Sequence, residues 1–280
     1  MPLEDDLCDI IKKSRLGRGL SVGDLARLTG LPGADIVAIE RGDQPRDRDE
    51  LRALAQGLGL RAASLEQIAL DHWTPRPLPT IEGVDTVQGE IGGYAVKGYV
   101  IHDGGEALLV DTAYNAPAML KLVEERGWRV VGIGLTHGHA DHSEGIELML
   151  NRWNVPVYLG ADDLSLLGWR PPTDRWINPE ESRTIAVGRL LVRCLLTPGH
   201  TPGGICYQTE TKIGPLCFVG DTLFAGSIGK SSPLQLYQTH LQSVRTRVLS
   251  LSKESILLPG HGPGTTVAEE LEHNPFHAHA

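Results

Sequence analysis

The first 70 residues carry apolar positions with the spacing of short amphipathic helices. The first helix places its core-facing residues at i, i+3, i+4 and i+7, namely Leu7, Ile10, Ile11 and Ser14. Ser21 is expected to cap a second helix that Gly30 ends, and Asp47 or Asp49 is expected to open a fourth. Ser64 is expected to cap the last one. Five short helices, with a glycine-containing turn between the second and third, predict a small all-α helix-turn-helix domain.

A proline-rich stretch over 71–80 separates these helices from a segment whose pattern predicts strands and turns. Prolines alternate with other residues at 75–79, which favours an extended, semi-rigid linker. Beyond it, short apolar runs bounded by turns predict strands at 94–101, 107–110, 130–135, 156–159, 190–195, 205–208, 216–219 and 255–258. Helical spacing is found at 117–126 and 146–153. This mixture predicts an α/β domain over 81–280 in which helices cover sheets.

Composition and charge narrow the class of protein. Apolar residues make up 41% and charged residues 22% of the 280 residues, which is typical of a globular chain with a core and not of a disordered one. The net charge of −9 makes the whole chain a poor electrostatic partner for nucleic acid. No apolar run approaches the ~20 residues of a membrane helix, and the acidic start lacks the pattern of a signal peptide. We therefore expect a cytoplasmic protein that does not bind membranes, with its four cysteines reduced.

The segment 131–142 is the most specific stretch of the sequence for chemistry. A buried apolar strand leads into a turn that carries three imidazoles and one carboxylate, namely His137, His139, Asp141 and His142. Gly138 and Ala140 are small, so the backbone can fold tightly and direct these side chains to a common centre. Imidazole nitrogens and carboxylate oxygens are suitable ligands for zinc or iron. The spacing therefore predicts a metal site.

Three later segments have the same form, an apolar strand that ends in a glycine-containing turn with one potential ligand. The ligands are His200 in 196–204, Asp221 in 217–222 and His261 in 257–263. Each segment alone is a weak signal, but all four in this order are a strong one. Because sites are commonly built at strand ends on a rigid scaffold, we expect the four turns to meet.

This ordered set of ligands resembles that of the metallo-β-lactamase superfamily over about 85–276. The resemblance implies an αβ/βα four-layer sandwich that holds two divalent metal ions, zinc with iron or manganese as alternatives. The implied ligands are His137, His139 and His200 for the first metal, Asp141, His142 and His261 for the second, and Asp221 as a bridge between them. Asp141 and Asp221 are the expected catalytic residues, and Asp111 matches an acidic residue that orients a ligand histidine. A metal pair acidifies a shared water, so no serine or cysteine nucleophile is required.

Within the superfamily, the sequence resembles the short bacterial type II glyoxalases, which are hydroxyacylglutathione hydrolases. The matching stretches are 136–142, 220–224, 226–230 and 259–263. The resemblance implies cleavage of a thioester or related ester, with Lys230 facing a substrate carboxylate and Ser227 close to the substrate. Ser231, Ser232 and Pro263 stand where those enzymes carry aromatic residues, which predicts weak binding of the thiol half of the substrate.

The residues leave other functions open. A persulfide dioxygenase shares the histidine motif, His200 and Asp221, but those enzymes carry a cysteine in the loop that corresponds to 226–227 and lack a complete second site. A lactonase needs the same metal pair, whereas Asp221 as a bridging ligand distinguishes the chain from true β-lactamases. Nucleases of the superfamily need a basic surface, but residues 71–280 carry 16 basic and 23 acidic side chains. The alternative from a different class is a ligand-sensing transcriptional regulator.

The N-terminal helices resemble the helix-turn-helix domain of the Cro and Xre repressors, most clearly at 39–42. The resemblance implies a domain over 1–70, but its expected groove-facing residues offer nothing to base edges: Gly33, Ala34, Asp35, Val37 and Ala38. With 10 basic and 12 acidic residues over 1–70, attraction to phosphates is weak too. A packing or dimerising module is therefore an equal alternative to DNA binding, and a homodimer stays open. The tail from His273 is expected to be a solvated terminus.

Overall fold

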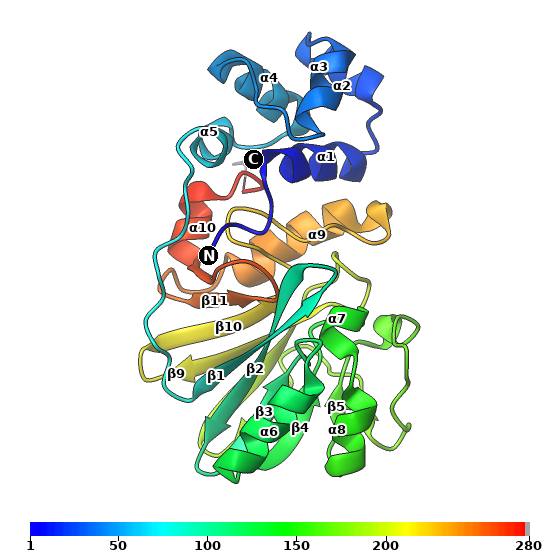
Figure 1. Ribbon diagram of the computed structural model, residues 1–280, viewed down its shortest axis with the longest axis vertical. Coiled ribbons are helices and arrows are strands. Elements are labelled where there is room, and N and C mark those ends of the chain that lie inside the picture. Colours follow the sequence, from blue (N-terminus) through cyan, green and yellow to red (C-terminus); the bar gives the residue numbers. More distant parts are fainter. Residues whose placement is uncertain (278–280) are drawn as a thin grey trace.

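The computed structural model describes residues 1–277. It begins with five helices that lie together at one end of the molecule (Figure 1). They are α1 (Leu7–Gly17), α2 (Val22–Thr29), α3 (Gly33–Ile39), α4 (Arg48–Leu58) and α5 (Ala62–Ala69). A segment without regular structure then runs over 72–81 along the side of the molecule to the first strand.

Most of the expected helix ends are found, and one is wrong. The side chains of Ser21 and Asp47 cap α2 and α4, and Gly30 ends α2 in the left-handed conformation (φ 74°). Ser64 does not cap α5, because it lies inside that helix. Its hydroxyl donates instead to the carbonyl oxygen of Glu272 (3.2 Å), so it joins α5 to the C-terminal helix α10 (Val267–His273).

Two six-stranded mixed sheets make up the rest of the framework. The first follows chain order: β1 (Val84–Ile91), β2 (Tyr94–Asp103), β3 (Glu106–Val110), β4 (Arg129–Gly134), β5 (Val157–Tyr158) and β6 (Trp176–Ile177). The second also has neighbours in chain order: β7 (Thr184–Val187), β8 (Leu190–Leu196), β9 (Ile205–Thr211), β10 (Gly214–Gly220), β11 (Ile256–Pro259) and β12 (Thr265–Thr266). β3 to β6 pair in parallel, as do β10 and β11, and the other pairs are antiparallel.

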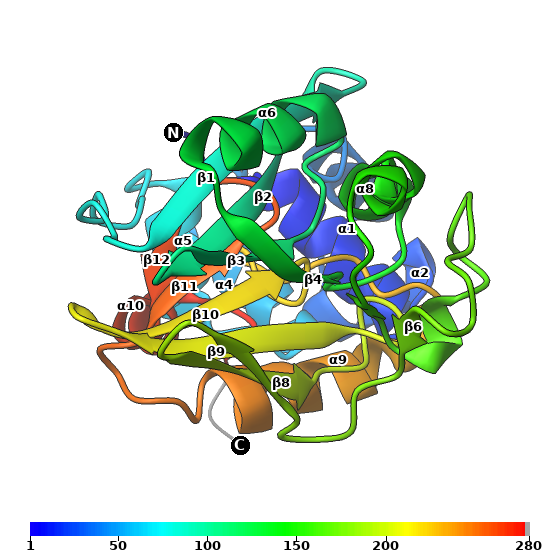
Figure 2. The same cartoon turned by 90° about the horizontal axis from the view of Figure 1, so that it is seen from below.

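The sheets face each other and carry helices on their outer faces (Figure 2). α6 (Ala116–Arg126) and α8 (Ile146–Arg152) cover the first sheet, and α9 (Tyr237–Ser243) lies beneath the second. The remaining helical segments are short: α7 (Ala140–Ser143), Ala161–Asp163, Leu234–Leu236 and the π-helical turn Val244–Val248. This is the αβ/βα sandwich that the sequence predicts.

The hydrophobic core is divided into three parts, and one of them joins the N-terminal helices to the sandwich. Side chains of the two inner sheet faces form one cluster, and α6 and α8 form another with the first sheet. The third cluster contains Leu25 and Leu54 of the helical segment together with Cys217 and Leu257 of the second sheet's outer face. Because these side chains share one core, burial of apolar area holds the helices onto the sandwich.

The end of the chain packs against the molecule, so the expectation of a solvated terminus is wrong for its described part. The ring of His273 stacks on Trp73 (4.6 Å between centroids), and Phe276 is buried. Asn274 donates to the carbonyl oxygen of Ser227 (3.0 Å). His279 lies outside the described residues. None of the helices found within 1–277 is long and apolar enough to span a bilayer.

Candidate metal centre

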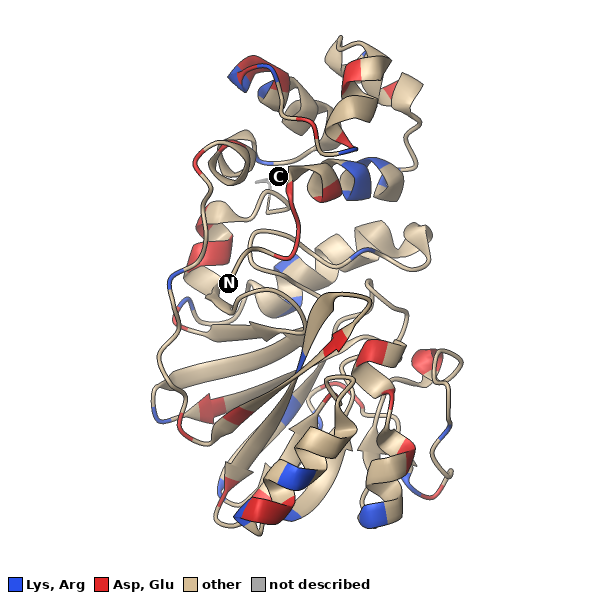
Figure 3. Cartoon of the chain, in the orientation of Figure 1, with Lys and Arg blue, Asp and Glu red and all other residues tan. Residues whose placement is uncertain are grey.

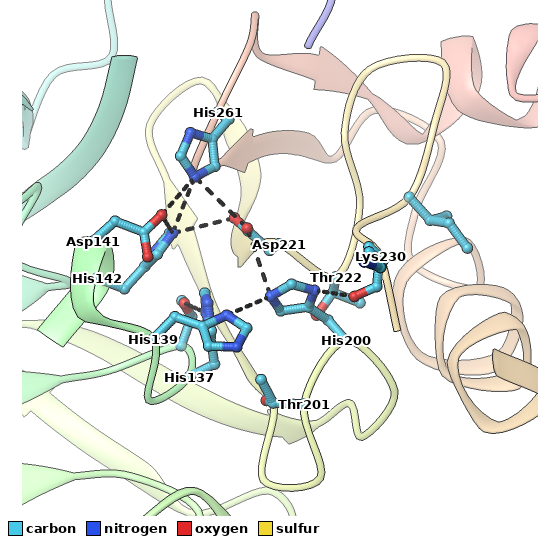
Figure 4. A network of polar contacts seen from close by, with 12 residues as sticks. His137, His139, Asp141, His142, His200, Thr201, Asp221, Thr222, Lys230 and His261 are labelled. Atoms are coloured by element: carbon cyan, nitrogen blue, oxygen red, sulfur yellow. Dashed lines mark hydrogen bonds and ion pairs between the residues drawn. The ribbon is translucent and has the colours of Figure 1, made fainter. Parts of the chain in front are cut away.

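Turns at the ends of four strands bring the predicted ligands to one place. His137 and His139 follow β4, His200 follows β8, Asp221 follows β10 directly, and His261 follows β11. Asp141 and His142 belong to α7, which continues the first of these turns. Figure 4 shows all seven side chains around a common centre. The structure therefore brings together every residue predicted as a ligand.

The donor atoms form two adjacent groups. In the first, Nε2 of His200 lies 3.0 Å from Nδ1 of His139, and His137 completes the group. In the second, Nε2 of His142 lies 3.4 Å from Nε2 of His261. Oδ2 of Asp141 lies 3.2 Å from the same His261 nitrogen.

Asp221 lies between the two groups. Its Oδ1 is 3.3 Å from Nε2 of His142, and its Oδ2 is 3.7 Å from Nε2 of both His200 and His261. The backbone nearby has no room for a side chain, because a Cβ added to Gly260 would lie 2.6 Å from Oδ1 of Asp221. Asp221 thus has the position expected of a bridging ligand.

The outward-facing ring nitrogens of four histidines are fixed by hydrogen bonds. Nδ1 of His200 donates to the carbonyl oxygen of Lys230 (2.8 Å), and Nδ1 of His261 donates to that of Ala95 (2.7 Å). The other two anchors are the contacts His142–Asp111 (2.9 Å) and His137–Thr136 (3.1 Å). In a neutral imidazole, a proton held at Nδ1 leaves the Nε2 lone pair for a metal. Burial opposes protonation of His142 and His261, but the neighbouring carboxylates outweigh it and raise both pKa values, so a metal bound there would displace a proton.

Asp111 is the buried residue that organises the second group. Its carboxylate accepts from the backbone N–H (2.7 Å) and the hydroxyl (2.8 Å) of Thr136, in addition to His142. The residue has φ 57°, in the left-handed region that non-glycine residues seldom adopt. Strain of this kind persists where the surroundings over-determine it, which fits a residue that must hold a ligand.

The residues present fit a pair of metal ions. Nε2 of His137 and Oδ1 of Asp221 are buried and have no hydrogen-bond partner among the described residues, as expected of ligand atoms. Zinc–nitrogen bonds of ~2.0–2.1 Å place two ligands of a tetrahedral site ~3.3 Å apart. The donor separations of 3.0–3.7 Å are close to that value. Nitrogen and carboxylate donors suit zinc and iron.

The protonation states also suit metal binding in the first group. Burial lowers the pKa of His200 to about 4, and burial together with the neighbouring imidazoles holds the pKa of His137 well below its ordinary value. Burial opposes ionisation of Asp221, but His142, His261 and His200 outweigh it and keep the pKa of that carboxyl well below its usual range. Neutral imidazoles and an ionised carboxylate are the forms that bind metals.

The two predicted substrate residues have different surroundings. Lys230 is exposed and lines a cavity of about 390 Å³ beside His200, Asp221 and His261. Ser227 is 1% exposed, does not line this cavity, and donates its hydroxyl to the carboxylate of Asp5. Its hydroxyl is therefore engaged in holding the N-terminal segment.

Sequence reasoning did not find two further contributions to the site. The buried carboxylate of Asp163 accepts from the backbone N–H groups of Gly138 (3.0 Å) and Gly203 (2.7 Å) and from the hydroxyl of Thr201 (2.7 Å), so it ties two ligand turns together. The other contribution is half of the cavity lining, which comes from the N-terminal segment: Glu4, Asp5, Asp9, Lys12, Lys13 and Leu16. No motif marks either set in the sequence.

Comparisons with known proteins agree with this geometry. The "Probable metallo-hydrolase YqgX" of Bacillus subtilis is 30% identical over 202 residues, covering 66% of this chain and 94% of its own length. The "Hydroxyacylglutathione hydrolase GloC" of Haemophilus influenzae is 30% identical over 190 residues, covering 62% and 88%. Among solved structures, the BLEG-1 B3 metallo-beta-lactamase superposes with a TM-score of 0.60 at 26% identity, covering 70% of this chain and all of its own.

A family model, that of the metallo-beta-lactamase superfamily, matches residues 91–261. This range contains all seven predicted ligand side chains and leaves α1–α5 outside it. The chain therefore belongs to the metallo-β-lactamase superfamily.

Proposed function

We propose that the protein is a metal-dependent hydrolase that cleaves a thioester, or a related ester, of a small molecule. The observation that supports this most directly is the convergence of seven potential ligand side chains, whose donor atoms form three overlapping groups. Two divalent ions bound there would supply a hydroxide near neutral pH and polarise a substrate carbonyl. The likeness to GloC favours a thioester among acyl compounds.

The chain's own residues define where the acyl group would lie. His200, Asp221 and His261 form the floor of the cavity, and Phe224 and Leu234 contribute apolar wall. A substrate would enter with its carbonyl toward this floor, where burial of the side chains strengthens electrostatic interactions. The side chain of Asp141 is 21% exposed and that of Asp221 is 10% exposed. Because Asp141 is the more accessible carboxylate, we propose that it accepts a proton from the attacking water.

In this proposal the N-terminal helices pack against the hydrolase domain and do not bind DNA specifically. They share a core with the sandwich, and their basic side chains are interspersed with acidic ones (Figure 3). Arg15, Arg46 and Arg48, for example, pair with Glu40, Glu50 and Glu66 respectively. Such paired charges leave little to attract phosphates, so we propose a packing module over 1–70, a linker over 71–80 and a hydrolase domain over 81–280.

A substrate panel tests the proposed activity. Metal-loaded protein is incubated with a hydroxyacyl-glutathione thioester, a lactone, a β-lactam and a glutathione persulfide, and product formation and oxygen uptake are followed. We expect thioester hydrolysis without oxygen uptake, with a high KM. Persulfide turnover that consumes oxygen, without any thioester cleavage, would replace the proposal by a dioxygenase.

A further inference from the structure

Helix α1 has two faces with different surroundings. One face is buried in the core shared with the second sheet, and it contains Leu7, Ile10, Ile11 and Ser14. The residues two positions further along repeat the same i, i+3, i+4, i+7 spacing and line the cavity over the metal centre: Asp9, Lys12, Lys13 and Leu16. Two residues correspond to about 200° around a helix, so this is the opposite face. The polar side of α1 is therefore one wall of the cavity.

Contacts on both sides hold this wall in place. Nζ of Lys13 donates to the carbonyl oxygen of Ile228 (2.5 Å), which lies two residues before Lys230, and it also pairs with Asp5. At the other end of the helix, a Cβ added to Gly17 would lie 2.4 Å from the ring of Tyr237. Such close packing fixes the distance between α1 and the sandwich.

The charges around the cavity are not all paired. Asp5 is engaged by Lys13, and the carboxylate of Asp9 accepts from the backbone N–H of Asp6 (3.2 Å). Lys12 and Lys230 are exposed, and neither has an ion pair within 1–277.

Glu4 is the remaining acidic group in the lining. Its backbone lies against Gly262, next to the ligand His261, where an added Cβ on the glycine would be 3.0 Å from the Glu4 nitrogen. Burial raises the pKa of the Glu4 carboxyl and its interaction with His261 opposes that rise, so the carboxylate lies on the side of the metal centre. Among the described residues, Lys12 and Lys230 are the exposed, unpaired positive charges of the lining.

We propose that α1 is part of the substrate-binding site and that Lys12, together with Lys230, binds a negatively charged group of the substrate remote from the scissile carbonyl. This inference rests on the proposed function and narrows it to anionic thioesters or esters. Leu16, Phe224 and Leu234 also line the cavity, which suits an apolar stem. Lys12 is then a specificity-determining residue supplied by the helical segment.

Binding of inert analogues tests the inference without turnover. Two thioether analogues, one ending in a carboxylate and one in its methyl ester, are titrated calorimetrically into metal-loaded wild type, Lys12→Ala, Lys12→Glu and Arg41→Ala. Arg41 is an exposed cation of the same helical segment that does not line the cavity, so it controls for net charge. We expect Lys12→Ala to weaken carboxylate binding about three- to fivefold, as for an exposed ion pair, and Lys12→Glu to weaken it more. The methyl ester should bind all four proteins equally.

The outcomes separate this inference from the proposed function. A wild type that does not prefer the carboxylate, or a preference that survives in Lys12→Ala, would overturn the role of Lys12. Equal losses for both analogues would indicate a structural effect and would overturn it too. If the wild type hydrolyses no thioester but still prefers the carboxylate analogue through Lys12, the proposed hydrolysis is refuted and the role of Lys12 in binding is not.

Discussion

Replacing Asp111 by asparagine should weaken metal binding without unfolding the protein. The side chain is 2% exposed, and its carboxylate meets three donors, two from Thr136 and one from His142. Asparagine has nearly the same volume and is among the residues that tolerate positive φ, so the backbone at φ 57° is kept. The perturbation is therefore confined to charge and hydrogen bonding.

The magnitude follows from the donor count. An asparagine offers one acceptor oxygen where the carboxylate has two, so its amide group must face Thr136 or His142, both of which donate. One buried donor is then left without an acceptor, at a cost of about 1–3 kcal/mol. Loss of an outer partner of a ligand histidine typically lowers metal affinity by about 10–100-fold, equivalent to about 1.4–2.7 kcal/mol. The two estimates agree.

The assay is competition for metal with a chromophoric chelator, which measures both binding steps. We expect the binding step of the metal held by His142 to weaken by about 10–100-fold in Asp111→Asn, because Asp111 anchors that imidazole. Asp174→Asn, at an exposed aspartate, is the matched control and should bind like wild type. Wild-type affinity for both metals in Asp111→Asn would refute the assigned role of Asp111.

Four further outcomes are expected. Asp221→Ala should lose activity and the second metal, measured by elemental analysis, and full occupancy with unchanged turnover would contradict a two-metal site. Asp163→Ala should lower the free energy of unfolding by about 1–3 kcal/mol for each donor left unpaired, and it should lower the metal content. Asp162→Ala, which changes the exposed neighbouring aspartate, should have neither effect. Burial lowers the pKa of His240 in the folded protein to about 3. Below about pH 6.5 the unfolded chain therefore takes up a proton at His240 that the folded protein does not, and the free energy of unfolding of the wild type should fall by about 2 kcal/mol between pH 7.5 and 5. Denaturant unfolding measured across this pH range should show a shallower pH slope for His240→Gln than for wild type. At physiological salt the protein should bind DNA only non-specifically, with Kd about 10⁻⁴ to 10⁻⁶ M, and a footprint at nanomolar protein would show otherwise.

The convergence of the candidate metal ligands is predictable from the sequence because each candidate lies in a short segment with its own strand and turn signals. An apolar run predicts the strand, a glycine predicts the turn, and the histidine or aspartate supplies the ligand. Strands with an uninterrupted apolar run are found within a few residues, as 216–219 is in β10 (Gly214–Gly220). The positions of the candidate ligands follow directly from where those strands end.

The elements that the sequence analysis missed are stabilised by the rest of the molecule. β1 (Val84–Ile91) is mostly polar and lies at the edge of its sheet, so pairing with β2, and not its own pattern, defines it. Asp163 carries no motif, and its role depends on turns that are distant along the chain. The polar face of α1 has the pattern of any solvated helix face, and only the docking of that helix turns it into a cavity wall.

Hydrolysis of a thioester by metal-free protein titrated with zinc tests the two-metal hydrolase most directly. We predict no turnover without metal and a rate that reaches its plateau at two equivalents per chain, with Asp221→Ala inactive at every point of the titration. A plateau at one equivalent, or full turnover by the metal-free protein, would contradict the account.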